Sequence, residues 1–206
     1  MPTANAANPR KQPRQRRAQA TVDAILQATA HILIEHGYEG ASTNRIAKRA
    51  GVSIGSLYQY FPNKTALVLA VANRHADQML NLLAQTAIDL ADAPIEQAVR
   101  SYVRAMVEAH AVEPELHRVL AAHALQSGFE HIVEIDRRAR RIVRTYLELR
   151  KDELIVGDIE TAAFVLVTSV DAIIHAHPLY EPDGIAFSAL EEEITALVLR
   201  YLTGKG

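Results

Sequence analysis

The chain of 206 residues contains no cysteine and no tryptophan, and only 5% of its residues are aromatic. The absence of cysteine excludes disulfides and metal sites with thiolate ligands. The longest apolar run, residues 162–176, is interrupted by Thr168, Ser169 and Asp171. Beyond residue 64 no segment shows the alternation of apolar and polar residues that is typical of strands. These absences predict an all-α protein without a membrane-spanning helix.

The first twenty residues lack the apolar segment of a signal peptide, so we expect a cytoplasmic location. A hydrophobic content of 49% is enough to bury a sizeable core. The length fits one small module followed by one larger helical domain.

Charge is divided unevenly along the chain. Residues 1–64 contain nine basic and three acidic residues, a formal charge of +6, and the remainder carries −8. A basic N-terminal module suits a polyanionic partner such as DNA. Residues 1–17 hold five of these cations without an apolar stripe, which predicts a flexible basic arm. This arm either reaches the DNA backbone or minor groove, or is only a solubilising tail.

Residues 42–64 have the pattern of two short helices joined by a tight turn. Ser42 or Thr43 can cap the first helix with its hydroxyl. Gly51 stands where that helix must end, and glycine tolerates the left-handed conformation of a C-terminal cap. Ser53 is placed to cap the second helix, and Asn63 to cap a third, longer one. The segment therefore predicts a helix-turn-helix.

The same segment resembles the DNA-binding domain of the tetracycline-repressor (TetR) family of bacterial transcription regulators. The matching positions are Gly37, Tyr38, Thr43, Ile46, Ala47, Ala50, Gly51, Val52, Ser53, Gly55, Leu57, Tyr58, Tyr60, Phe61 and Lys64. The resemblance implies a supporting first helix, a second helix that crosses the DNA backbone, and a third that enters the major groove. It places a three-helix DNA-binding domain at residues 18–69 and a larger helical ligand-binding and dimerisation domain at residues 70–206.

Carried over by position, the resemblance implies two sets of DNA contacts. The phosphate contacts are Thr43, Tyr58, Tyr60 and Lys64. The candidates for base-edge contact are Asn44, Ser53, Ile54 and Gly55, and Arg45 and Ser56 complete the predicted interface. Tyr60 differs from the histidine or other aromatic residue that many relatives have at this position.

Helices are expected over about 64–90, 94–111, from Pro114, 129–151, 158–177 and 185–202. The last two have apolar stripes that predict a homodimer contact, with internal core as the alternative. Their small residues are Ala162, Ala163, Thr168, Ser169, Ala172 and Ala176, and their larger apolar residues are Phe164, Val167, Val170, Ile174, Leu190, Ile194, Leu197 and Tyr201. Such a dimer would read a palindromic operator.

The family resemblance also implies a pocket for an unidentified small-molecule effector. Tyr102, Met106, His110 and His123 are the candidate ligand contacts, and ordinary core packing is the alternative. We predict no cofactor. We also predict no metal site, because His175 and His177 are two residues apart and point in different directions on a helix. The arginine-rich segment 137–144 is predicted to be a solvated face, with an acidic partner or a second DNA contact as the alternative.

The sequence therefore predicts a non-enzymatic, ligand-responsive repressor. Residues 51–55 match the G-x-S-x-G pattern of hydrolases, but that chemistry needs a preceding strand, and a helix is expected there. Two other functions remain open: a DNA-binding activator, and a small-molecule-binding or scaffolding protein whose helix-turn-helix is only structural.

Overall fold

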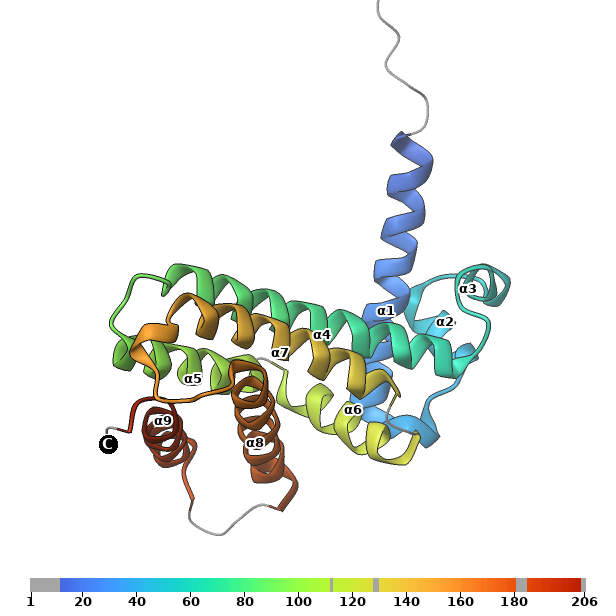
Figure 1. Ribbon diagram of the computed structural model, residues 1–206. Helices are drawn as coiled ribbons and strands as arrows, with labels where there is room; N and C mark the ends of the chain where they lie inside the picture. Colours follow the sequence, from blue (N-terminus) through green and yellow to red (C-terminus); the bar gives the residue numbers. More distant parts are fainter. Residues whose placement is uncertain (1–11, 112, 128–129, 181–184, 205–206) are drawn as a thin grey trace, which may run out of the picture. The chain divides into compact units, whose positions relative to one another are not determined.

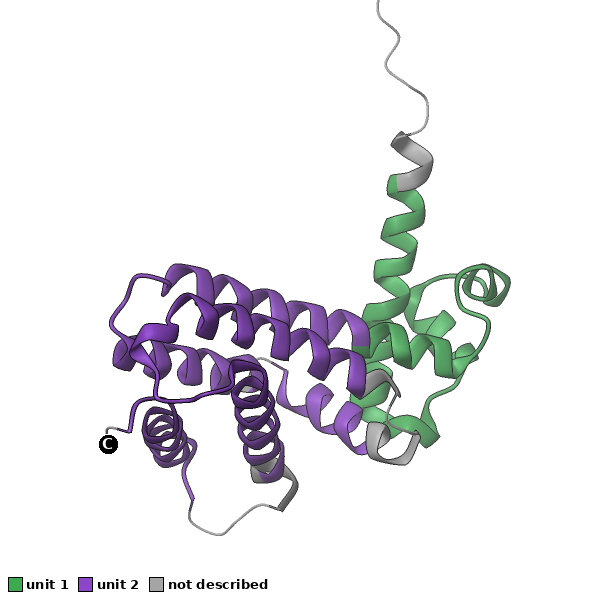
Figure 2. Ribbon diagram, in the orientation of Figure 1, with its two compact units in different colours: residues 1–72 green, residues 73–206 purple. Residues whose placement is uncertain are grey.

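The computed structural model describes residues 12–111, 113–127, 130–180 and 185–204, and these contain helices and loops but no strand. The chain forms two compact units, Met1–Ala72 and Asn73–Gly206 (Figure 2). The predicted all-α fold is confirmed.

The helices follow one another with short connections (Figure 1). In chain order they are α1 (Gln12–Gly40), α2 (Thr43–Ala50), α3 (Ile54–Tyr60), α4 (Lys64–Asp89), α5 (Ile95–Ala111), α6 (Pro114–Ser127), α7 (Glu130–Leu149), the 3₁₀ helix η1 (Lys151–Glu153), α8 (Ile159–Tyr180) and α9 (Phe187–Thr203). Helix α4 belongs to both units, because the boundary between Ala72 and Asn73 lies within it.

The first unit packs α2 against α1 and α3 against α2. Its core contains fully buried side chains from three helices, among them Ile25, Ile46 and Leu57. Gly51 ends α2 in the left-handed conformation, at φ 67°, so the turn between α2 and α3 has the predicted glycine cap. Helix α2 is thus fixed against α1 and α3 against α2, and the opposite side of α3 is left to solvent.

Helix α1 begins earlier in the sequence than expected. It begins at Gln12, so residues 12–17 of the expected basic arm are helical, and residues 1–11 lie outside the described part. The sequence from Gln15 to Ala20 contains only Gln, Arg and Ala, which are good helix formers, and they extend the helix without an apolar face. Near its other end, Gly37 has a φ of 64°, which interrupts the helical backbone before Tyr38.

The second unit packs α8 against α7, α9 against α5, and α6 against both α5 and α8. Its core contains buried residues of α5, α7, α8 and α9, including Val103, Leu147 and Ile194. Arg150, at the end of α7, donates to the carbonyl oxygens of Ala91 and Ala93 at 2.8 and 2.7 Å. This guanidinium therefore ties the loop between α4 and α5 to the end of α7.

Helix α8 bears on two expectations, the absence of a membrane-spanning helix and the dimer contact. Residues 159–176 are long and apolar enough to cross a membrane by length and composition alone, because two acidic residues and three hydroxyls do not offset the apolar ones. In this unit the helix instead supplies core. Several residues expected at a dimer contact are buried within their own unit, namely Ala162, Ala163, Val167, Val170, Ile174 and Ile194. Phe164, Thr168, Ala172 and Leu197 remain exposed.

Candidate nucleic-acid interface and histidine cluster

Helix α3 exposes the side that was predicted to face DNA. Leu57 is fully buried and anchors the helix, whereas Ile54, Tyr58 and Tyr60 are 38%, 50% and 38% exposed. Exposed apolar and aromatic side chains that lie together on one short helix mark a surface that a partner can cover. Gly55 is also exposed, and a Cβ built there would meet only the Ser53 hydroxyl, at 3.9 Å. The backbone of the first turn is thus open to close approach.

Two serines at the start of α3 are engaged with the helix itself. Ser53 Oγ accepts a hydrogen bond from the Ser56 backbone N–H at 3.0 Å, and the two hydroxyl oxygens lie 2.9 Å apart. The predicted N-cap at Ser53 is therefore confirmed. The segment Gly51–Gly55 joins two helices, so it lacks the strand that a hydrolase nucleophile elbow requires.

Thr43 and Tyr58 connect the first turn of α2 to α3. Their hydroxyl oxygens lie 3.1 Å apart and share a hydrogen bond. Two residues predicted from the family resemblance to contact phosphate are thereby placed next to each other. A tyrosine hydroxyl held in this way is already oriented, which would reduce the entropy lost if it bound a phosphate oxygen.

The cations of the predicted interface are held by the backbone. Lys64 Nζ donates to the Tyr38 carbonyl oxygen at 2.9 Å and lies 4.0 Å from the centroid of the Tyr38 ring. Arg45 Nη1 donates to the Gly40 carbonyl oxygen at 2.5 Å. Neither interaction neutralises its charge. Asn44 is exposed on the same turn of α2, and Asn63 caps α4 by accepting from the Ala66 N–H at 2.8 Å.

The predicted effector contacts lie in the second unit, on or after α5. Tyr102, Met106 and His110 follow at four-residue spacing along one side of α5. Met106 packs against the core, as the core-packing alternative expects, while His110 is buried. The side chain of His123 lies outside the described residues. These positions stay a prediction.

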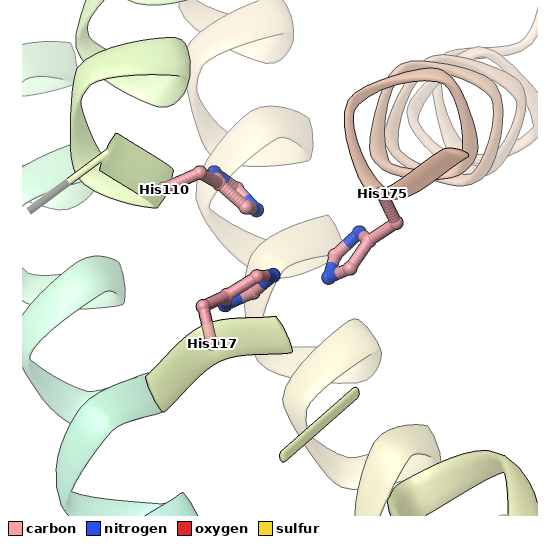
Figure 3. Close-up of side chains that lie close together, drawn as sticks. All are labelled: His110, His117 and His175. Carbon is pink, nitrogen blue, oxygen red and sulfur yellow. The ribbon is translucent and has the colours of Figure 1, made fainter. Parts of the chain in front are cut away.

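His110 belongs to a cluster of histidines that the sequence did not reveal. His117 of α6 and His175 of α8 lie beside it, with ring centroids 4.7 to 5.1 Å apart (Figure 3). His75 of α4 contacts His117, with His75 Nε2 3.2 Å from His117 Nδ1. The four residues span a hundred positions of the chain, so no sequence spacing could have grouped them. The only available signal was the high number of histidines, nine in all.

Burial sets the protonation of most of the cluster. It lowers the pKa of His75 and of His110, and together with the charges of the neighbouring histidines it lowers the pKa of His117 to about 3. His175 differs, because burial is outweighed by the Asp171 carboxylate, 3.3 Å from Nδ1, and its pKa is raised. These shifts favour the neutral form, with an imidazole lone pair, in His75, His110 and His117, and the charged form in His175.

The arginine-rich segment of α7 is compensated by carboxylates. Four arginines border an open groove of about 380 Å³ together with Glu160 of α8. The pairs are Arg137 and Arg141 with Glu134, Arg140 with Asp136, and Arg144 with Glu160. This pairing favours a solvated, ion-paired face over a second DNA contact.

Two family models match the chain. Residues 25–71 match the model described as bacterial regulatory proteins, tetR family, and residues 94–202 match the tetracyclin repressor-like C-terminal domain. The chain is 38% identical over 85 residues to the HTH-type transcriptional activator FasR of Mycolicibacterium smegmatis, covering 41% of this chain and 36% of that protein. It spans between 34% and 65% of the length of the first curated relatives that it matches.

Solved structures share the fold over most of the chain. SmeT, the repressor of the Stenotrophomonas maltophilia multidrug efflux pump SmeDEF, has a TM-score of 0.71 at 24% identity and covers 92% of this chain and 93% of its own. The regulator FadR of Bacillus subtilis, solved with stearoyl-CoA, has a TM-score of 0.68 at 21% identity and covers 85% of this chain and 96% of its own.

Proposed function

The chain belongs to the TetR family of bacterial regulatory proteins, and we propose that it is a transcriptional regulator that binds a specific duplex DNA sequence. The observation that carries this proposal is the outer side of α3, which is capped, anchored by Leu57 and left exposed. The groups that contact DNA bases are the Ile54 side chain and the backbone at Gly55, with Asn44 beside them.

Phosphate oxygens are bound by the paired hydroxyls of Thr43 and Tyr58 and by Tyr60. Lys64 and Arg45 supply positive charge on either side. The internal hydrogen bond between Ser53 and Ser56 makes these two serines positioning residues for the first turn of α3. They contribute to binding through the shape of that turn more than through base-edge hydrogen bonds.

The protein acts as a homodimeric repressor on a palindromic operator, with two copies of α3 about 34 Å apart along the duplex. SmeT is named a repressor and FasR an activator, so family membership is compatible with either direction of regulation. Repression needs only occupancy of a promoter, and this simpler mechanism is the one proposed. The protein is cytoplasmic and has no catalytic activity.

A small-molecule effector binds within the second unit, near Tyr102, Met106 and His110. FadR was solved with stearoyl-CoA, a ligand with a long apolar chain, which fits an effector site lined by apolar and aromatic residues. Helix α4 contributes residues to both units, so it is the element through which effector binding changes DNA affinity. The coupling is reciprocal, and DNA weakens effector binding by the same factor.

Fluorescence anisotropy with labelled DNA from the promoter region of the protein's own gene tests the proposal, with a scrambled duplex as competitor. We expect the promoter duplex to bind about 1000-fold more tightly than the scrambled one. Tyr58→Phe, which removes only the hydroxyl, should weaken promoter binding about tenfold, because a hydrogen bond to a charged phosphate is lost.

Tyr146→Phe is the matched control. The Tyr146 hydroxyl is buried on α7 and has no hydrogen-bond partner among the described residues, so its removal should leave DNA affinity unchanged. If no promoter duplex binds, or if Tyr58→Phe binds as tightly as the parent protein, the proposed interface is wrong. A scaffold with a structural helix-turn-helix would give the first of these results.

A further inference from the structure

In three of the clustered histidines, one ring nitrogen already has a hydrogen-bond partner. Nδ1 of His110 lies 2.7 Å from the Met106 carbonyl oxygen, and Nδ1 of His175 lies 2.8 Å from the Asp171 carbonyl oxygen. A carbonyl oxygen can only accept, so each Nδ1 carries the proton and donates. In the neutral form of each ring the tautomer is therefore fixed, and Nε2 is left with a lone pair that can bind a cation.

The tautomer of His117 is set in the same way, through His75 and Glu113. Nδ1 of His117 lies 3.2 Å from Nε2 of His75, whose own Nδ1 is 3.6 Å from a carboxylate oxygen of Glu113. The nearby Glu113 carboxylate favours the proton on His75 Nδ1, which makes His75 Nε2 the acceptor for His117 Nδ1–H. Nε2 of His117 is again left with a lone pair.

The free nitrogens lie together inside the unit. One nitrogen from each of His110, His117 and His175 lies within 4.8 Å of the other two. Nε2 of His110 and of His117 are buried and have no hydrogen-bond partner among the described residues. Figure 3 shows the three rings, from α5, α6 and α8, pointing toward a common centre. Buried unpaired nitrogens are costly, and each needs an explanation.

We propose that His110, His117 and His175 form a binding site for a divalent transition-metal ion of the zinc type. Converging lone pairs attract a cation, whereas an anion would need N–H donors, and those of His110 and His175 point away from the centre. Three imidazoles are a common ligand set for Zn²⁺, which binds nitrogen at about 2.1 Å.

The geometry needs only side-chain adjustment. In a tetrahedral site with bonds of about 2.1 Å, ligand nitrogens lie about 3.4 Å apart. The longest separation here, at most 4.8 Å, must shorten by about 1.4 Å, which small rotations of the rings can supply. The described side chains offer three ligands, so the fourth position accepts water or an oxygen atom of a small molecule.

The surrounding contacts have the form expected around a metal. Histidine ligands usually donate their second ring N–H to a carbonyl or a carboxylate, which fixes the ring and strengthens the ligand. Met106 and Asp171 do this for two of the rings, and His75 does it for His117. His75 is thus a positioning residue, which acts on the ion through His117.

Cobalt binding to the full-length, chelator-treated protein tests the site without DNA, so its outcome is independent of the proposed regulatory function. Titrated Co²⁺ should give the visible absorption bands of a four-coordinate ion at one equivalent, and Zn²⁺ should displace it. The bands should be lost in His110→Gln, in His117→Gln and in His175→Gln. His75→Gln should keep the bands but weaken binding about tenfold or more.

His31→Gln is the matched control, because His31 is an exposed histidine of α1, outside the cluster. Circular dichroism verifies that each variant is folded. Zinc-edge X-ray absorption of the parent protein gives a second measurement that needs no variant, with three imidazole ligands expected. Absence of four-coordinate cobalt bands, their retention in all three cluster variants, or a zinc ion without imidazole ligands would overturn the proposal.

Discussion

Gly51 is a residue whose identity is set by backbone conformation alone. Its φ is 67°, and a Cβ built on it would meet nothing within 4 Å. Any cost of a side chain here is therefore conformational and does not come from a clash. The turn that joins α2 to α3 depends on this single left-handed residue.

Gly51→Ala should lower the free energy of unfolding by about 1 kcal/mol, because alanine disfavours the left-handed region. Chemical denaturation followed by circular dichroism measures this difference. Gly157→Ala is the control. A Cβ there also has open space, and its φ is not in the left-handed region, so we expect no loss of stability. Equal effects of the two substitutions would show that the left-handed conformation is not what requires glycine at residue 51.

At the same scale, the sequence predicted the capping residues of the helix-turn-helix. Ser53, Asn63 and Gly51 have local roles that depend only on neighbours three or four positions away, so the pattern was sufficient. It did not show that Ser56 binds the Ser53 hydroxyl, or that Arg45 turns back to Gly40. These side chains have several possible partners, and only the folded structure selects one.

Helices α1 and α2 are joined by an ion pair. Both carboxylate oxygens of Glu35 accept from Arg49 Nη1, at 2.7 and 2.6 Å. The hydrogen bond from Arg49 lowers the pKa of Glu35. A lowered pKa in the folded state means that the pair stabilises the unit above the ordinary glutamate pKa. This contribution is lost as the pH falls through the pKa of the folded state.

Arg49→Gln should raise the pKa of Glu35 toward its ordinary value, because the guanidinium that favours the charged carboxylate is removed. NMR titration of the Glu35 side chain measures the shift directly. In Arg45→Gln, which removes a cation bound to a backbone carbonyl instead, the pKa of Glu35 should stay lowered. A Glu35 titration that is identical in Arg49→Gln and in the parent protein would mean that the pair does not form in solution.

Element boundaries in the second unit were predicted to within a few residues, because prolines and glycines mark most of them. The expected helix over 129–151 is in fact α7, Glu130–Leu149, followed by the short 3₁₀ helix η1. Which side of each helix is buried was less predictable. In α8, Ala162 and Ile174 looked suitable for a partner subunit, but α7 already covers that helix. The histidine cluster was missed because four separate helices supply it.

At the scale of the whole molecule, the proposed homodimer depends on the residues that α8 and α9 leave exposed. Phe164 and Leu197 are 49% and 47% exposed, and Val165 is 38% exposed. On α8, Phe164, Thr168 and Ala172 follow at four-residue spacing and form an exposed face that a second copy of the chain can cover, and Leu197 of α9 adds exposed apolar surface.

Phe164→Glu should shift the protein from dimer to monomer, because dimerisation would bury a carboxylate in place of an apolar ring. Sedimentation equilibrium over a range of concentrations measures the change. Leu149→Glu is the control, since Leu149 is 69% exposed on α7, outside this face. A dimer that persists in Phe164→Glu, or a monomeric parent protein, would place the contact elsewhere or remove it.

Helix α3, from Ile54 to Tyr60, contains no charged residue. Cations that release counterions from DNA must therefore come from other elements of the first unit, such as Arg45 and Lys64. In the proposed interface, the slope of binding affinity against salt concentration is consequently set outside α3, while discrimination between sequences comes mainly from α3, with Asn44 of α2 beside it. Substitutions on the outer side of α3 can alter the preferred operator without changing how strongly ionic strength governs binding. If the proposed interface is right, sequence recognition and electrostatic attraction are thus separable properties, each able to vary without the other.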